Sequence, residues 1–302
     1  MTRRVSAIFC VLICVSMTAT AQEHSHKTVT LMQAPSISRL KVSYAVPHRA
    51  TVDPSGNILV ADIRAGVVFK TRPDGSTSVL ADGLNQPVSV ITDEVGNAYI
   101  ATAGQGKTGA GRIYKVTPEG ERETLHGDLT SPTDILRDDT GTFTIALGTK
   151  NQIVTVDPDG AVETLCDRIK QPSALARGRD GELFIASRKG QIYQLLANGR
   201  IQKLADDLKS PTGLAICHDG RLVVASNDLK LTVIEKGGVK SFAKVPQGTT
   251  DIAFTPRGNM VIVNKLLQSV TRVTTRTQIP CPHCDKPIPV ILKKPKPSDT
   301  SF

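Results

Sequence analysis

Short apolar runs separated by glycine-containing turns fill most of the chain. Residues 172–205 show the pattern, with apolar runs of four or five residues that end in turns containing Gly181, Gly190 and Gly199. Such runs, rich in Val, Ile, Leu and aromatic residues and bounded by Gly, Asp, Asn and Pro, are typical of β-strands. No helical periodicity of useful length competes with them. The segment therefore predicts four consecutive antiparallel strands.

This four-strand unit recurs six times. Each copy begins with a proline nine residues before a glycine, except the last copy, in which threonine replaces the proline. The pairs are Pro47/Gly56, Pro87/Gly96, Pro132/Gly141, Pro172/Gly181, Pro211/Gly220 and Thr249/Gly258. A fixed period of about 40 residues with four strands per copy is typical of a propeller blade. The sequence therefore predicts an all-β fold, a six-bladed β-propeller of four-stranded antiparallel blades.

The two ends of the repeat region predict how the ring closes. The sixth copy has three strand runs and no fourth, whereas the run Ser36–Tyr44 precedes the first copy and has no blade of its own. We expect this N-terminal strand to complete the last blade, because closure removes two exposed sheet edges. The propeller is expected to cover residues 34–277.

The N-terminus predicts export. Arg3 and Arg4 precede an apolar run, residues 5–15, that is too short to span a bilayer, and a small-residue cleavage motif ends at Ala21. We expect residues 1–21 to be a signal peptide, residues 22–33 a linker, and the protein to be periplasmic or secreted with no membrane span. The formal net charge is +9, but the basic residues are scattered, so nucleic acid is not an expected partner.

The C-terminal tail, residues 278–302, contains a Cys-x-x-Cys pair formed by Cys281 and Cys284. The pair is similar to half of a zinc ribbon, and a closed Zn²⁺ site would need further ligands, such as those of a second chain. A local disulfide is an alternative in an exported protein, and a tail without a defined role is another. Cys166 and Cys217 belong to blades that are not neighbours, so we expect them to be buried free thiols.

The ends of the inner strands are expected to line one mouth of the central channel. In an up-and-down blade, the start of the first strand and the end of the second lie on the same face. The polar residues at these positions are His48, Arg49, Asp62, Arg64, Asp134, Lys150, Arg188, Asn227, Asp228, Asp251 and Asn264, with Lys265 next to the last. We expect a ligand to bind there.

Asp134 and Asp251 belong to the third and sixth copies, which face each other across a ring of six. Two carboxylates that converge on a channel could hold a divalent cation such as Ca²⁺ through their oxygens. The alternative is that they accept hydrogen bonds from backbone N–H groups at strand ends.

Two stretches of the repeat resemble NHL repeats. They are PSGNILVAD with VVFKTRPDG, residues 54–62 and 67–75, and RDGELFIAS with QIYQLLANG, residues 179–187 and 191–199. The chain is also similar to gluconolactonase-type and virginiamycin B lyase-like propellers. The resemblance implies either a binding platform, such as an exported sensor domain, or a hydrolase with a divalent metal in the channel.

The residues at the blade starts favour the binding platform. The gluconolactonase pattern includes an early glutamate in a Glu-Gly-Pro context and an asparagine directly after a blade-leading proline. The residues after the leading prolines here are His48, Val88, Thr133, Ser173 and Thr212. Only His48 matches by location the histidine of a virginiamycin-type lyase. We therefore expect a non-catalytic binding or sensor module for a protein, peptide or glycan, with no required cofactor. The alternative is a metal-dependent, lactonase-like hydrolase or lyase that uses Asp134, Asp251 and Asn264.

Overall fold

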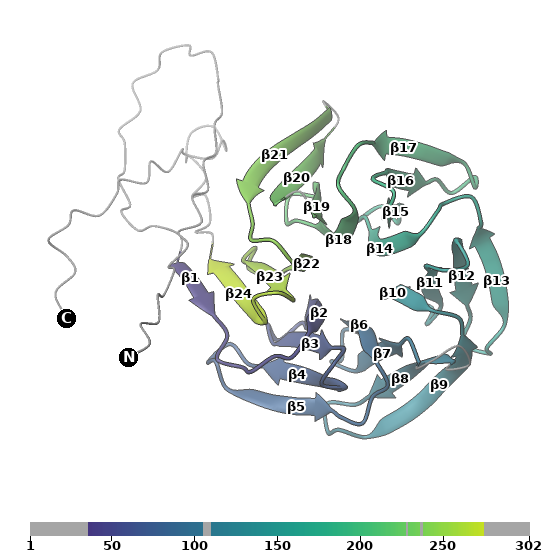
Figure 1. Ribbon diagram of the computed structural model, residues 1–302. Coiled ribbons are helices and arrows are strands. Elements are labelled where there is room, and N and C mark those ends of the chain that lie inside the picture. Colours follow the sequence, from purple (N-terminus) through teal and green to yellow (C-terminus); the bar gives the residue numbers. More distant parts are fainter. Residues whose placement is uncertain (1–35, 105–109, 228, 236–237, 275–302) are drawn as a thin grey trace, which may run out of the picture.

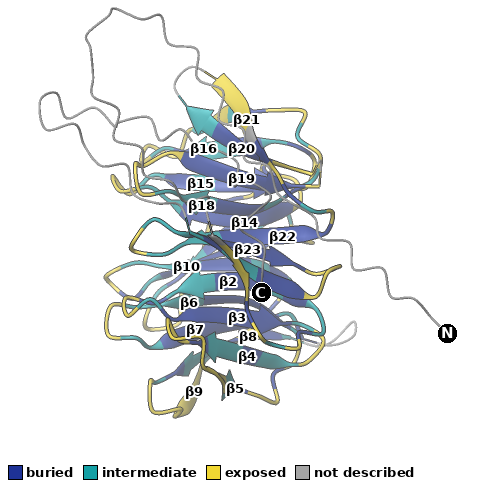
Figure 2. Cartoon of the chain, turned by 90° about the vertical axis from the view of Figure 1, so that its left-hand side faces the viewer, coloured by how far each residue is buried: buried dark blue, intermediate teal, exposed yellow. Residues whose placement is uncertain are grey.

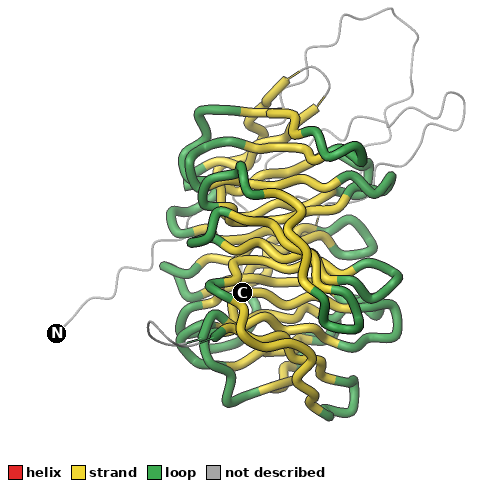
Figure 3. Tube along the Cα trace, turned by 90° about the vertical axis from the view of Figure 1, so that its right-hand side faces the viewer, coloured by secondary structure: helices red, strands yellow, loops and turns green. Residues whose placement is uncertain are grey.

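The protein is a closed ring of six four-stranded antiparallel sheets (Figure 1). The computed structural model describes residues 36–104, 110–227, 229–235 and 238–274, and this part contains strands and loops but no helix (Figure 3). The prediction of a six-bladed propeller is confirmed. The predicted signal peptide, linker and tail, with Cys281 and Cys284, lie outside the described residues, as does Asp228.

Each blade runs from an innermost strand at the axis to an outermost strand at the rim. The strands of blades one to three are β2 (Pro47–Val52), β3 (Ile58–Asp62), β4 (Val67–Thr71), β5 (Thr77–Ala81); β6 (Pro87–Thr92), β7 (Ala98–Thr102), β8 (Gly111–Val116), β9 (Arg122–Leu129); and β10 (Pro132–Arg137), β11 (Phe143–Leu147), β12 (Gln152–Val156), β13 (Val162–Cys166). Those of blades four to six are β14 (Pro172–Arg177), β15 (Leu183–Ser187), β16 (Ile192–Leu195), β17 (Ile201–Ala205); β18 (Pro211–Ile216), β19 (Leu222–Ser226), β20 (Lys230–Glu235), β21 (Gly238–Lys244); and β22 (Thr249–Phe254), β23 (Met260–Asn264), β24 (Ser269–Thr274), β1 (Ser36–Arg39).

The N-terminal strand closes the ring as the sequence predicts. Strand β1 pairs antiparallel with β24, from Ser36 opposite Thr274 to Arg39 opposite Thr271. The strand is shorter than the predicted run, which continues to Tyr44. The rest of that run leaves the sheet and packs Tyr44 into the core between blades one and six, where its ring meets Phe69 edge-on.

Aspartates close the turns between the first and second strands in blades one to three. In blade one the N–H of Asn57 donates to Asp53 Oδ1 at 2.8 Å, and Gly56 takes a φ of 82°. Asp93 and Asp138 accept the equivalent bonds in the next two blades. Glycine is needed because a side chain is strained at this φ. The nine-residue spacing from proline to glycine therefore spans one inner strand and its turn, which is why it recurs.

The start of each first strand is tied to the end of the second strand. In blades two to six, a residue with positive φ stands before the leading proline or threonine: Gln86 (55°), Ser131 (50°), Gln171 (46°), Ser210 (47°) and Gly248 (86°). The N–H of Arg188 donates to the carbonyl of Gln171 at 3.0 Å, and the N–H of Lys265 to that of Gly248 at 2.9 Å. These bonds hold the first residue after each second strand at the mouth of the channel.

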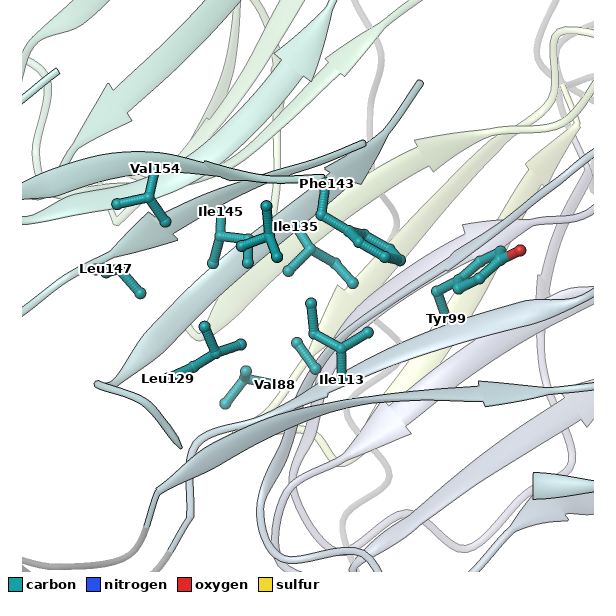
Figure 4. Packing of buried hydrophobic residues seen from close by; sticks show 11 residues of the cluster. Val88, Tyr99, Ile113, Leu129, Ile135, Phe143, Ile145, Leu147 and Val154 are labelled. Atoms are coloured by element: carbon teal, nitrogen blue, oxygen red, sulfur yellow. The ribbon is translucent and has the colours of Figure 1, made fainter. Parts of the chain in front are cut away.

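The core lies between neighbouring blades. Figure 4 shows Val88 and Ile113 of blade two packed against Ile135 and Ile145 of blade three. Buried residues concentrate in the inner strands, while the loops at the two faces of the ring are exposed (Figure 2). Burial of this apolar surface supplies the main driving force for folding.

The two described cysteines are free thiols, but only one is buried. Cys166 is buried at the end of β13. Cys217 is half-buried, contrary to expectation, and its thiol donates to Asp219 Oδ1 at 2.7 Å. Burial and the neighbouring carboxylate raise the pKa of the Cys217 thiol, so it is protonated at neutral pH. Within the described ranges, no helix is long and apolar enough to cross a membrane.

Candidate functional site at the channel

Six residues occupy equivalent positions around the axis of the ring, one on each innermost strand. They stand two positions after the leading residue of each blade and are all buried. In blade order they are Arg49, Ser89, Asp134, Ala174, Gly213 and Asp251. The long cation of blade one therefore faces two carboxylates and three small residues.

The guanidinium group of Arg49 lies between the carboxylates of Asp134 and Asp251. Its Nη1 donates to Asp251 Oδ1 at 2.8 Å, and its Nη2 lies 3.2 Å from Asp134 Oδ2. Nη2 also donates to the carbonyl of Ser173 at 2.5 Å. One arginine side chain thus connects blade one with blades three, four and six across the axis.

The two carboxylates also accept hydrogen bonds from backbone N–H groups, as the alternative interpretation of the sequence states. Asp134 accepts from the N–H groups of Leu175 at 2.8 Å and Ile135 at 3.0 Å, and from Ser89 Oγ at 2.8 Å. Asp251 has one backbone donor, the N–H of Ala50 at 3.0 Å. Burial raises the pKa of Asp251 to about 6, and the charge of Arg49 and the N–H of Ala50 offset only part of this effect.

A divalent cation does not fit between these carboxylates. The Arg49 guanidinium already lies there, and bringing a cation next to it would cost electrostatic repulsion in a buried site. Among the described residues, no group of three His, Cys, Asp or Glu side chains could hold a metal ion.

Asp62 and Asn264, two further predicted mouth residues, bind the backbone. Both end a second strand. Asp62 is fully buried and accepts from the N–H groups of Ala45, Val46 and Ala65 at 2.6, 2.9 and 3.0 Å. The side-chain amide of Asn264 donates to the carbonyls of Pro246 and Gln247, and its Oδ1 accepts from the N–H of Leu267 at 2.8 Å. Their polar atoms therefore shape the loops around the channel.

Gly213 leaves the room that Asp251 needs. A Cβ atom on Gly213 would lie 2.8 Å from Asp251 Oδ1 and 2.9 Å from Asp251 Cα, closer than normal packing permits. We expect Gly213→Ala to destabilise the protein by about 1–3 kcal/mol through overpacking. Urea unfolding measures the effect. Gly127→Ala is the matched control, since its Cβ would meet no atom within 4 Å, and an equal loss in both variants would contradict the prediction.

His48 stands at the mouth, one position before Arg49. The imidazole is half-buried, and its Nδ1 donates to the carbonyl of Val88 at 2.8 Å, which leaves Nε2 as an acceptor. Burial and the positive charges of Arg49, Arg188 and Lys265 lower the pKa of His48 to about 3. The ring is therefore neutral at physiological pH, and the electrostatic potential around it is positive.

Exposed cations lie on the loops that follow the second strands, at the same mouth as His48. They are Arg64, Lys150, Arg188, Lys189 and Lys265. None of the ion pairs formed among the described residues includes any of them. Partial desolvation and the charge of Arg49 lower the pKa of Arg188. Asn227 is exposed at the equivalent position of blade five.

The predicted mouth residues thus form two groups. Arg49, Asp62, Asp134, Asp251 and Asn264 are buried and bonded within the fold, whereas the exposed or half-buried group contains His48, Arg64, Lys150, Arg188 and Asn227. Sequence reasoning missed the contacts of Arg49 with the two aspartates. A signal was present, because Arg49 is the only long cation among the six axial positions.

Arg49 also lines a cavity among the inner strands. The cavity measures about 210 Å³ and is lined mostly by apolar residues such as Ile91, Leu136, Ala215 and Ala253. The Nε of Arg49 is buried and has no hydrogen-bond partner within the described residues.

Comparison with known proteins shows a shared fold. No family model and no curated protein matches this sequence. Among solved structures, a gluconolactonase from Xanthomonas campestris has 15% identity and a TM-score of 0.70, covering 80% of this chain and 89% of its own. A streptogramin B lyase has 13% identity and a TM-score of 0.63, covering 80% and 97%. Virginiamycin B lyase from Staphylococcus aureus has 16% identity and a TM-score of 0.59, covering 80% and 99%. The chain therefore shares the propeller fold of gluconolactonase-type and virginiamycin B lyase proteins.

Proposed function

We propose that this protein is an exported, non-catalytic binding module whose ligand docks at the channel mouth around His48. The observation that carries the proposal is the position of Arg49 between Asp134 and Asp251. The basic and apolar segment of residues 1–21 supports export.

A metal-dependent hydrolase needs acidic or amide side chains that are free to bind the metal and to face the substrate. Here the three residues that such a hydrolase would use, Asp134, Asp251 and Asn264, are buried and bonded to Arg49 or to the backbone. The mouth instead offers Arg188 and Lys265, exposed cations that form no ion pair among the described residues. Unpaired, solvent-accessible charge suits recognition of a ligand of opposite sign.

Metal analysis paired with a lactone-hydrolysis assay tests this proposal. Purified protein, equilibrated with calcium and then dialysed, is expected to hold less than stoichiometric metal and to show no calcium-dependent hydrolysis. One calcium ion per chain, together with hydrolysis that is lost in Asp134→Ala and kept in Asp139→Ala, would refute it. Asp139 is the control because it is an exposed carboxylate of the same blade at the turn between its first two strands.

A further inference from the structure

We propose that the ligand is an acidic peptide segment, bound through its carboxylates to Arg188 and Lys265 and through a neighbouring apolar side chain to Leu266 and Leu267. This inference rests on the proposed binding function and adds the chemical class of the ligand. Four observations support it.

The inner loops of the mouth are basic. The loops that follow the second strands carry five exposed cations, as described above, and Asp62, at the end of one of these strands, is fully buried. Exposed carboxylates on the same face, such as Asp82, Asp167 and Asp206, lie in the loops that follow the outermost strands. A group of exposed cations on the inner loops attracts an anionic ligand.

Arg188 and Lys265 both lie on loops of the mouth, in blades four and six. They stand at equivalent positions, as the first residue after β15 and after β23, and the same type of backbone bond holds each in place. Both charges act on the ring of His48. Because neither cation is neutralised by a described carboxylate, an incoming carboxylate would gain attraction from both.

His48 adds a hydrogen-bond acceptor at the mouth. Its Nδ1 is used by the carbonyl of Val88, and its Nε2 makes no hydrogen bond to the described residues. A neutral imidazole nitrogen without a proton accepts from an N–H or O–H group and does not bind a second anionic oxygen. The combination of two cations and one acceptor matches a peptide, which offers carboxylates and backbone N–H groups side by side.

Exposed aliphatic side chains lie next to the cations. Leu266 and Leu267, directly after Lys265, are 59% and 52% exposed. In the corresponding loop of the neighbouring blade five, Leu229 is 46% exposed and holds a φ of 64°, a strained conformation for a bulky residue. No aromatic side chain is exposed among the side chains that the structure describes. Aliphatic contact suits the leucine or valine of a peptide better than the flat ring of a sugar.

Fluorescence polarisation with two matched peptides tests the inference. The probe is a short, labelled, soluble peptide of alternating leucine and glutamate, and its control has glutamine in place of glutamate. The glutamate peptide is expected to bind at least about tenfold more tightly, and its affinity to fall as salt is raised. Arg188→Gln and Lys265→Gln are each expected to weaken binding by about five- to tenfold.

Control variants distinguish specific peptide binding at the mouth from general electrostatic attraction to a basic protein. Arg200→Gln and Arg257→Gln remove the same charge from exposed positions of the same two blades, in turns at the opposite face, and are expected to leave binding unchanged. Equal binding of the two peptides would overturn the inference, and so would an equal loss in all four variants. Tighter binding of a galacturonic acid oligomer than of the glutamate peptide would identify an anionic glycan instead.

The two proposals can fail separately. Calcium-dependent lactone hydrolysis would refute the non-catalytic module whatever the peptides do. Failure of the glutamate peptide to bind, with no hydrolysis detected, would refute the acidic-peptide ligand and leave the binding function open to another ligand class.

Discussion

Replacement of Arg49 by alanine is expected to lower the free energy of unfolding by about 3–5 kcal/mol. The change leaves the buried carboxylates of Asp134 and Asp251 facing each other without their shared cation. It also removes the donors that join blade one to the carbonyl of Ser173 in blade four and to Asp251 in blade six. Urea unfolding followed by circular dichroism measures the loss.

Two further variants show whether the buried charge is the cause. Arg64→Ala removes an exposed arginine of the same blade and is expected to change stability by less than about 0.5 kcal/mol. A triple variant, Arg49→Met with Asp134→Asn and Asp251→Asn, removes all three charges and is expected to recover part of the loss. If Arg49→Ala were as mild as Arg64→Ala, the central role of this ion cluster would be wrong.

Calcium provides a second readout for the same variant. In Arg49→Ala the gap between the carboxylates becomes free for a divalent cation, so calcium is expected to raise the melting temperature of the variant. The wild-type protein, in which the guanidinium occupies that gap, is expected to show no such increase.

Acidification is expected to destabilise the protein through His48. The pKa of this histidine falls from 6.5 to about 3 in the folded protein. Between these two pH values His48 is protonated in the unfolded chain and neutral in the folded protein. The free energy of unfolding therefore decreases as the pH falls from 6.5 towards 3. Each unit of pKa shift corresponds to about 1.4 kcal/mol. In His48→Gln, whose amide can still donate to the carbonyl of Val88, the decline is expected to be shallower.

Asp251 opposes this trend over a narrower window. Its pKa rises from 3.8 to about 6 in the folded protein, so the folded state binds the extra proton there and gains stability as the pH falls through 6. Asp251→Asn is therefore expected to steepen the acid loss. Urea unfolding at a series of pH values measures both slopes, and parallel curves for wild type and His48→Gln would contradict the role of the histidine.

The local chemistry of the repeat is enough to predict the architecture. Proline stands at the start of the inner strand in five blades and threonine in the sixth, and glycine accepts the positive φ of the turn nine residues later, as at Gly56. Both effects act within a few residues, so they can be recognised along the chain. The closure by β1 is also predictable. The sixth copy of the repeat has only three strands, and one strand precedes the first copy, so that strand can complete the sixth blade.

The sequence predicts where the site residues lie along the repeat, but it does not predict which atoms they contact. The register places Arg49, Asp134 and Asp251 at equivalent positions of their inner strands, and in the structure these three side chains are in contact. The repeat register does not show which atoms a side chain contacts. The sequence therefore left open whether the carboxylates of Asp134 and Asp251 bind a cation or the backbone. The residues that occupy equivalent positions in other blades, Ala174 and Gly213, are small enough for Arg49 to cross the axis, and that consequence appears only when the six blades are assembled.

Taken alone, the sequence determines the number of blades, their strand order and the residues that reach the channel, because strand and turn preferences are local and repeat with the chain. Tertiary structure alone decides that the central cation is the side chain of Arg49 and that Asp62 and Asn264 are used by the backbone. It also decides that Arg188 and Lys265 form no ion pair with the described residues and that His48 is neutral beside them. The physical reason is that Arg49 and Asp251 are 202 positions apart in sequence, so their ion pair depends on ring closure.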